Sequence, residues 1–319
     1  MTYKPLFPYF GGKSRVAAQV WERFGKVTNY VEPFFGSGAV YFHCPYELKT
    51  ATVNDLDGYI CNFWRAVQAD PEAVAEHADW PVNELDLHAR NAYVTSRREE
   101  FTDWLRADPE RYDVKIAGWW VWGACAAIGN SWATGRGSWG VQEDGTWGKV
   151  EGGAVQGLPQ IDSRGRGIHR PQTNIRELMT EINSKLRGVR VCCGDFSRTL
   201  GKGVTYRLGN NRVETAVFLD PPYADDRRAG LYAKDDLTVY QRAEQWCREN
   251  GDNPLLRIAL CGYEGHYNLP RWEAIPWKAN GGYGSQGKGR GRANASREVV
   301  LFSPSCANGG SQTEGKKKC

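Results

Sequence analysis

The segment Asp220-Pro221-Pro222-Tyr223 directly follows the apolar run Ala216 to Leu219, which predicts a buried strand that ends at an acid. Two consecutive prolines fix φ and remove two backbone donors, so the Asp220 carboxylate and the Pro221 carbonyl face a ligand as fixed acceptors. An amino group with two hydrogens is the natural partner of these acceptors. Tyr223 adds a flat ring on which a base can stack. The pattern favours a site that orients the amine of a base, with Asp220, Pro221, Pro222 and Tyr223 as catalytic candidates.

A second motif, Glu32-Pro33-Phe34-Phe35-Gly36-Ser37-Gly38, follows a predicted strand over 29–34. Its two glycines let the backbone turn tightly and lie close to a ligand. Asp55 stands 17 residues after Gly38, at the end of the next predicted strand, where a carboxylate can accept both hydroxyls of a ribose. No third glycine follows at the spacing of the dinucleotide-binding pattern, so the glycine pair alone leaves a plain turn as an alternative.

Predicted strands and helices alternate along much of the chain. The strands are expected over 29–34, 51–53, 189–193, 216–219, 257–261 and 299–302. The helices are expected over 39–44, 59–67, 116–128 and 175–186. This alternation predicts an α/β fold with a doubly wound sheet. Because such sheets bind ligands at the carboxyl ends of their strands, the motifs at these ends are expected to form one composite site.

The sheet-forming stretches, 1–70 and 185–304, are separated by an insertion over 71–184 of a different composition. Residues 129–168 are rich in Gly, Trp and Ser, and a structureless stretch of that length usually either binds something or is disordered. Its tryptophans are expected to pin it to the body of the protein, with base contacts as the alternative. The tail over 305–319 is expected to be disordered.

These motifs and their order resemble those of the Dam-type (D12 class) DNA adenine-N6 methyltransferases of the alpha group, especially phage-encoded ones. The resemblance covers roughly 1–70 and 185–304, and the family places its variable target-recognition region in the intervening stretch. Asp220-Pro221-Pro222-Tyr223 is similar to the family's catalytic motif and Pro33 to Gly38 to its cofactor loop. The remaining matches are Tyr9 to Lys13 (closing over the methionine part of the cofactor), Asn54-Asp55 (ribose) and Gly194-Asp195-Phe196 (adenine).

The resemblance implies a Rossmann-like, S-adenosylmethionine-dependent methyltransferase sheet with an inserted, mainly helical or loop recognition domain. It implies S-adenosylmethionine as cofactor without a metal, and transfer of a methyl group to the N6 amine of an adenine flipped out of DNA. The cofactor-binding residues are then expected to be Tyr9, Phe10, Lys13, Pro33, Phe34, Gly36, Ser37, Gly38, Asp55, Asp195, Phe196 and Asp220.

Local basic clusters indicate where double-stranded DNA would bind. The runs 198–212 and 281–297 contain several Lys and Arg and no acid, and the second is flexible enough to follow a phosphate backbone. Solvated loops are the alternative for either run alone. The expected DNA contacts are Arg198, Lys202, Arg207, Lys288, Arg290, Arg292 and Arg297.

Composition narrows the class of protein further. The chain has 319 residues, a net charge of +4 and no apolar run long enough for a membrane span. Nine cysteines, an odd number without CxxC spacing, argue against a disulfide framework or a zinc site. We expect a cytoplasmic protein of a bacterium or phage-infected cell, monomeric or weakly dimeric. Whether a restriction enzyme is paired with this protein stays an open question.

Four other activities are weighed against this interpretation. Cytosine-N4 methylation of DNA uses the same amine acceptors, and RNA adenine methylation is also compatible with them. A binding module without activity would have no use for a methyl-donor pocket. A nicotinamide dehydrogenase leaves the Asp-Pro-Pro-Tyr segment unexplained.

Overall fold

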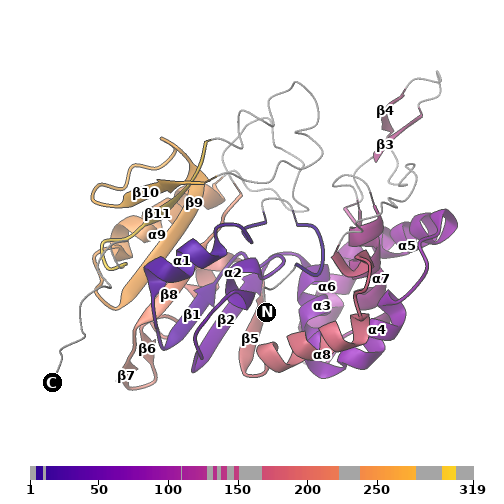
Figure 1. Cartoon of the computed structure of the whole chain (residues 1–319), viewed down its shortest axis with the longest axis horizontal. Coiled ribbons are helices and arrows are strands. Elements are labelled where there is room, and N and C mark those ends of the chain that lie inside the picture. Colours follow the sequence, from indigo (N-terminus) through magenta and orange to yellow (C-terminus); the bar gives the residue numbers. More distant parts are fainter. Residues whose placement is uncertain are drawn as a thin grey trace.

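The computed structural model describes residues 5–9, 12–108, 110–127, 132–134, 138–141, 147–150, 167–222, 238–277 and 297–306, with only the backbone of 138–141 and 147–150. In this part of the chain a seven-stranded sheet lies beside a group of helices (Figure 1). The sheet order is β10-β11-β9-β8-β1-β2-β5. Its strands are β1 (Asn29–Glu32), β2 (Thr50–Asp55), β5 (Val189–Cys193), β8 (Thr215–Leu219), β9 (Leu256–Tyr263), β10 (Glu273–Pro276) and β11 (Glu298–Phe302).

Five neighbouring strands, β9, β8, β1, β2 and β5, run parallel to one another. At the edge, β11 pairs antiparallel with β9, and β10 pairs antiparallel with β11. From β1 the chain moves to β2 and β5 on one side and later returns through β8 and β9 on the other. The strand order therefore reverses between β1 and β8. The carboxyl ends of these two strands form the crevice in which open α/β sheets bind ligands.

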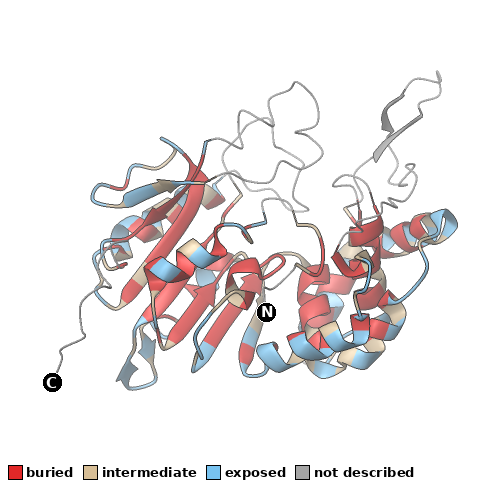
Figure 2. Ribbon diagram, viewed as in Figure 1, coloured by how far each residue is buried: buried red, intermediate tan, exposed pale blue. Residues whose placement is uncertain are grey.

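Side chains alternate between two cores along the central strands, as the pleat of a sheet buried on both faces requires. In β8, Ala216 and Phe218 join the larger core, and Val217 and Leu219 join the smaller one. The strands are buried along nearly their whole length in the middle of the sheet (Figure 2). This two-sided burial explains why β8, β9 and β11 appear in the sequence as continuous apolar runs.

Helices cover both faces of the sheet and extend beyond its β5 edge. Val20 of α1 and Val40 of α2 belong to the larger core, and Val239 and Ala243 of α9 belong to the smaller one. The helices are α1 (Ala17–Phe24), α2 (Ala39–Phe42), α3 (Gly58–Ala69), α4 (Pro71–Ala78), α5 (Glu84–Ser96), α6 (Arg98–Ala107), α7 (Val114–Ala126), α8 (Ile175–Leu186) and α9 (Val239–Asn250). Short elements complete the description: η1 (Gly167–His169), η2 (Phe196–Thr199), and the hairpins β3 (Ser138–Val141) with β4 (Trp147–Val150) and β6 (Arg207–Leu208) with β7 (Asn211–Arg212).

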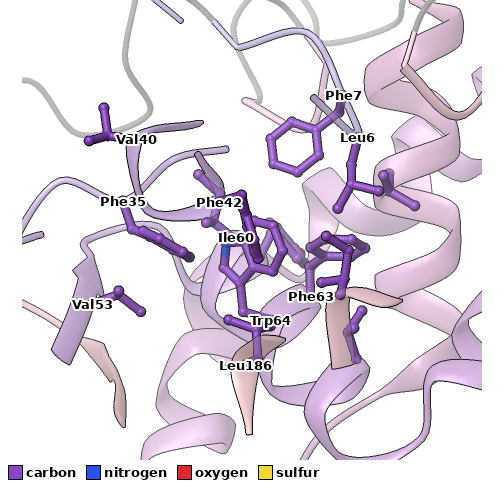
Figure 3. Packing of buried hydrophobic residues seen from close by; sticks show 14 of the residues in the cluster. Leu6, Phe7, Phe35, Val40, Phe42, Val53, Ile60, Phe63, Trp64 and Leu186 are labelled. Carbon is purple, nitrogen blue, oxygen red and sulfur yellow. The ribbon is translucent and has the colours of Figure 1, made fainter. Parts of the chain in front are cut away.

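Trp64 of α3 lies where the glycine-rich loop, the N-terminal segment and the helices meet (Figure 3). Its indole is 1% exposed, its ring contacts those of Phe35 and Phe42, and its Nε1 donates to the carbonyl of Gly36 at 3.1 Å. Phe7 packs on the same ring from the N-terminal segment. The core therefore packs directly against the loop after β1 and supports it.

The predicted α/β fold with a doubly wound, mainly parallel sheet is confirmed. Its expected strands correspond to β1, β2, β5, β8, β9 and β11, and the expected helices to α2, α3, α7 and α8. The elements α1, α9 and β10 were not predicted, nor were α4, α5 and α6 within the polar stretch after residue 70. Those three helices each bury one face, so their polar composition reflects the opposite, solvated face.

The division into a two-part catalytic domain and an inserted region over 71–184 stays a prediction. Most of the Gly- and Trp-rich stretch and the tail after Cys306 lie outside the described residues. Within the described part, Trp132 is 8% exposed and donates to the carbonyl of Trp120, so this tryptophan is pinned to α7. No helix among the described residues is both long and apolar enough to traverse a bilayer.

We predict that Gly118→Ala destabilises the protein because α4 and α7 approach closely at this position. An added Cβ would lie 2.5 Å from His77 Cβ and 2.8 Å from the carbonyl oxygen of Val74, so backbone must shift. Overpacking costs about 1–3 kcal/mol, which exceeds the roughly 1 kcal/mol that Ala gains over Gly in a helix. Chemical denaturation should show a net loss of about 1 kcal/mol or more.

Gly203→Ala is the matched control, because nothing lies within 4 Å of a Cβ at that position. Its free energy of unfolding should stay within about 0.5 kcal/mol of wild type. Equal stabilities for the two variants would contradict the close approach of α4 and α7.

Candidate active site

The site lies at the carboxyl ends of β1, β2, β5 and β8, around the point where the strand order reverses. β1 leads into the loop 33–38, β2 ends at Asp55, β5 leads to Asp195 and β8 leads to Asp220. Because these strands are parallel neighbours, their ends share one edge of the sheet. The structure thus brings the motifs at these strand ends to one edge, as the sequence predicted; the individual roles of their residues stay predictions.

Lys13 and Asp220 form a buried ion pair at this edge. The Lys13 Nζ lies 2.7 Å from Asp220 Oδ2, and the two side chains are 4% and 21% exposed. The ammonium also lies over the ring of Trp277, 5.5 Å from its centroid. Burial alone would lower the pKa of Lys13, but the charge of Asp220, with smaller contributions from Cys261 and Glu298, raises it above its ordinary value.

The loop after β1 passes close to Tyr9, which leaves no room for a side chain at Gly36. Gly36 has φ +46° and Gly38 φ +65°, both in the left-handed region that favours glycine. A Cβ on Gly36 would lie 2.4 Å from the Tyr9 ring. The N-terminal segment therefore packs directly on this loop, and Ser37 between the two glycines is 3% exposed.

Asp55 braces the same loop from the neighbouring strand. Its Oδ2 accepts from the backbone N–H of Gly36 and its Oδ1 from that of Asp57, each at 2.9 Å. Burial raises the pKa of Asp55 to about 6, an effect that these two N–H donors oppose. The backbone N–H of Leu56 is a third donor to the carboxylate, which holds the loop in place and has one of about four lone-pair sites left for a ligand.

Asn54 ties the loop to the end of β5. Its Nδ2 donates to the carbonyls of Pro33 and Gly194, each at 3.0 Å, and its side chain is 1% exposed. The backbone adds bonds from Phe35 N to Asn54 O and from Gly194 N to Asp55 O. The ends of β1, β2 and β5 are thus cross-linked at fixed separations.

Glu32 is a buried acid at the end of β1 that the sequence analysis quoted but gave no role. It is 3% exposed and accepts from the Tyr30 hydroxyl at 2.8 Å. Burial raises the pKa of Glu32 well above its usual range, and the nearby charges of Asp220 and Asp55 add to the effect. The feature of the sequence that could have identified Glu32 as a site residue is its position directly before Pro33.

The motif after β5 forms its own small cluster. Asp195 accepts from Ser197 N at 3.0 Å and from both terminal nitrogens of Arg242 at 2.8 and 2.9 Å. Hydrogen bonds from Arg242 lower the pKa of Asp195 to about 2. Phe196 stacks with Phe34 at a centroid distance of 5.0 Å. Arg242 was missed by the sequence analysis because no motif surrounds it.

The described candidates for DNA contact fall at two ends of the sheet. Arg198 follows β5 and donates to Cys193 O, and Arg297 lies over the Tyr263 ring beside the end of β9; both are near the site. Arg207 lies in the β6–β7 hairpin, at the amino end of β8 (Figure 1), and the turn that contains Lys202 leads into it. β8 is five residues long, so this hairpin is roughly 16 Å of strand away from Asp220.

Several predicted site residues lie outside the described part of the chain: Phe10, Tyr223, Lys288, Arg290 and Arg292. Pro221 is buried and Pro222 half-buried at the end of β8. In the described residues no group of three or more His, Cys, Asp or Glu side chains could hold a metal ion.

Comparison with known proteins relates the chain to DNA methyltransferases. Residues 9–121 match the family described as D12 class N6 adenine-specific DNA methyltransferase. A curated protein of Methanocaldococcus jannaschii, the Type II methyltransferase M.MjaIII, is 28% identical over 240 residues, which cover 70% of each chain. The family match includes Tyr9, Lys13, the loop 33–38 and Asp55, and it continues through α4–α6 into α7, further than the resemblance was traced from sequence.

We predict that Lys13→Met destabilises the protein by about 3 kcal/mol. Removal of one partner of a buried ion pair leaves an uncompensated charge, which costs about 3–5 kcal/mol; the 21% exposure of Asp220 places the expected loss at the low end. The double variant Lys13→Met/Asp220→Asn should recover much of this loss, because no unpaired charge remains. Denaturant unfolding of both single variants and the double variant measures the coupling. Additive losses would contradict a direct ion pair.

Proposed function

We propose that this chain is a D12 class N6 adenine-specific DNA methyltransferase and that it transfers a methyl group from S-adenosylmethionine to the N6 amine of an adenine flipped out of double-stranded DNA. The observation that carries this proposal is the meeting of Asp220 with the glycine-rich loop and Asp55 at one edge of the sheet. An amine acceptor and a nucleoside-binding acid then lie on the ends of two strands that flank β1.

The residues at this edge fit the cofactor. Asp55 accepts from three backbone N–H groups and keeps a lone pair for a ribose hydroxyl, and the loop it braces has no side chain at Gly36 or Gly38. Phe34 and Phe196 offer aromatic surface for an adenine beside Asp195. When bound there, S-adenosylmethionine supplies an electrophilic methyl group, and Tyr9 and Lys13 flank the loop that would hold it.

Asp220 and the Pro221 carbonyl would accept the two N–H groups of the target amine. The lone pair of this amine is delocalised into the ring, so it is a poor nucleophile. Two fixed acceptors favour the tetrahedral form that can attack, and they hold the nitrogen in line for transfer. Lys13 occupies Asp220 Oδ2, which leaves Oδ1 to face the amine. The ammonium thereby fixes the orientation of the carboxylate and compensates its charge.

DNA would reach the site across the edge where the strands end. Arg198 and Arg297 lie at this edge, which supports phosphate contacts for these two residues. Lys202 and Arg207 would require a path along the sheet to its other end. The recognition region and the basic residues Lys288, Arg290 and Arg292 remain sequence predictions, and so does action in a bacterial or phage-infected cell, where the DNA lies.

The experiment that tests the proposal identifies the methylated base. Duplex DNA is incubated with the protein and S-adenosylmethionine, digested to nucleosides and analysed by mass spectrometry. N6-methyl-2′-deoxyadenosine in the duplex digest supports the proposal. Three other outcomes would each replace it with one of the other activities considered: N4-methyl-2′-deoxycytidine instead, a methylated product only with RNA, or no product despite cofactor binding.

We predict that Asp220→Ala lowers the rate of methyl transfer at saturating substrates by at least about 10²–10³-fold, the usual effect of removing one placed electrostatic partner. Asp220→Asn keeps the shape and one acceptor oxygen and should retain more activity than the alanine variant. Single-turnover assays with radiolabelled S-adenosylmethionine measure both. Asp252→Ala is the control, because Asp252 is an exposed acid paired with Arg271 on the surface. Activity of Asp220→Ala within tenfold of wild type would refute the role of this acceptor.

We predict that cofactor affinity falls as the pH falls through about 6, because the ionised Asp55 accepts hydroxyl protons better than the acid does. With a folded pKa of about 6 against about 3.9 in an unfolded chain, ionisation of Asp55 costs folding stability. The stabilising contribution is therefore complete below about pH 4 and is lost as the pH rises through 6. Cofactor binding has the opposite dependence and strengthens over the upper part of the same range.

Calorimetry with S-adenosylhomocysteine between pH 5 and 8 measures this dependence. The dissociation constant should rise by up to about tenfold per pH unit below 6, and Asp55→Asn should bind more weakly with a flat profile. Asp252→Asn, at an exposed acid paired with Arg271 on the surface, is the control that should keep the wild-type profile. A pH-dependent Asp55→Asn variant would assign the titration to another group.

A further inference from the structure

Phe196, the aromatic residue expected to line the cofactor adenine, is covered in this structure. Its ring stacks with that of Phe34 at an interplanar angle of 30°, and the Arg242 guanidinium lies over it at 4.9 Å from the centroid. Phe196 is 4% exposed. An adenine can therefore stack on Phe196 only after one of these two neighbours moves.

The Asp195 carboxylate also has hydrogen-bond donors from neighbouring residues. Its Oδ1 accepts from Ser197 N, Ser197 Oγ and one Arg242 nitrogen, and its Oδ2 accepts from the other Arg242 nitrogen. Three donors use Oδ1 and one uses Oδ2, so a lone pair remains on Oδ2. The amino group of an adenine would have to reach it beside the Arg242 guanidinium, which donates to both oxygens.

Arg242 is the neighbour that can move at the lower cost. Phe34 belongs to the loop that Asn54 and Asp55 hold at fixed positions through Pro33 and Gly36. The Arg242 side chain is 42% exposed and Asp195 44%, so this bidentate pair lies at the surface. Exposed pairs contribute only about 0.2–1 kcal/mol, and a guanidinium over a ring contributes about 0.5–2 kcal/mol, so a ligand of moderate affinity can displace the side chain.

We propose that Arg242 competes with the adenine of the cofactor: in the resting protein it covers Phe196 and occupies Asp195, and it swings away when the adenine binds. This inference rests on the proposed function, since it takes the adenine site from it. Arg242 belongs to α9, the first described helix after Asp220. Its pair with Asp195 connects α9 to the cofactor pocket, and binding of the cofactor breaks this contact. The pair thereby lowers cofactor affinity in the resting state.

The test compares Arg242→Ala with Arg248→Ala for binding of S-adenosylhomocysteine and adenosine by calorimetry. Arg248 is on the same helix but pairs with Glu244, so its variant makes the same change of charge away from the pocket. Arg242→Ala should bind both ligands about three- to tenfold more tightly, the size of the contacts removed, and Arg248→Ala should match wild type.

Salt dependence provides a second readout that a general loosening of α9 would not reproduce. Adenosine is uncharged, so its binding to wild type should strengthen with added salt as the Asp195–Arg242 attraction is screened. Arg242→Ala should lose this dependence. Equal or weaker binding by Arg242→Ala, or a wild-type affinity that does not change with salt, overturns the proposal. Failure of wild type to bind S-adenosylhomocysteine at all overturns the proposed cofactor site instead, and this inference with it.

Discussion

The ion pair between Lys13 and Asp220 buries a positive and a negative charge 2.7 Å apart where the strand order reverses. Removing two charges from water is expensive, and their attraction repays the cost only when the geometry is held closely. The surrounding structure supplies that constraint. The Lys13 carbonyl accepts the first N–H bonds of α1, and Asp220 follows a strand that is buried on both faces. The N-terminal segment is thereby held over the site, where Tyr9 also packs on Gly36.

The parallel topology then determines which residues can meet. β1, β2, β5 and β8 come from distant parts of the sequence, and each continues from the sheet at the same edge. Asn54 and Asp55 cross-link three of these strand ends through side-chain and backbone bonds, so the loop after β1 has little freedom left. A site assembled in this way is positioned by the sheet itself, and the loops need only present their groups.

The fold was largely predictable because its central strands are buried on both faces and appear as apolar runs. Asp55 and Asp220 were identified because each stands at the end of such a run, and a motif at the carboxyl end of a parallel strand has only one edge at which to lie. The pairing of Lys13 with Asp220 was not predicted, because a contact between residues far apart in the sequence leaves no local pattern. Arg242 and β10 were missed likewise: an exposed arginine on an amphipathic helix and an edge strand with exposed residues have no distinctive spacing.

Three carboxyl groups, those of Glu32, Asp55 and Asp220, stand at the ends of three adjacent strands, and three buried negative charges there would repel one another strongly. Each of the three carboxyl groups has different neighbouring groups. Lys13 compensates Asp220, backbone N–H groups partly offset the burial of Asp55, and burial raises the pKa of Glu32 well above its usual range although the Tyr30 hydroxyl donates to it. The site therefore holds an ion-paired acid at the end of β8, an acid braced by backbone N–H groups at the end of β2 and, between them on β1, an acid whose burial favours its neutral form. In the proposed function, that order separates an acceptor for an amine from an acceptor for hydroxyls.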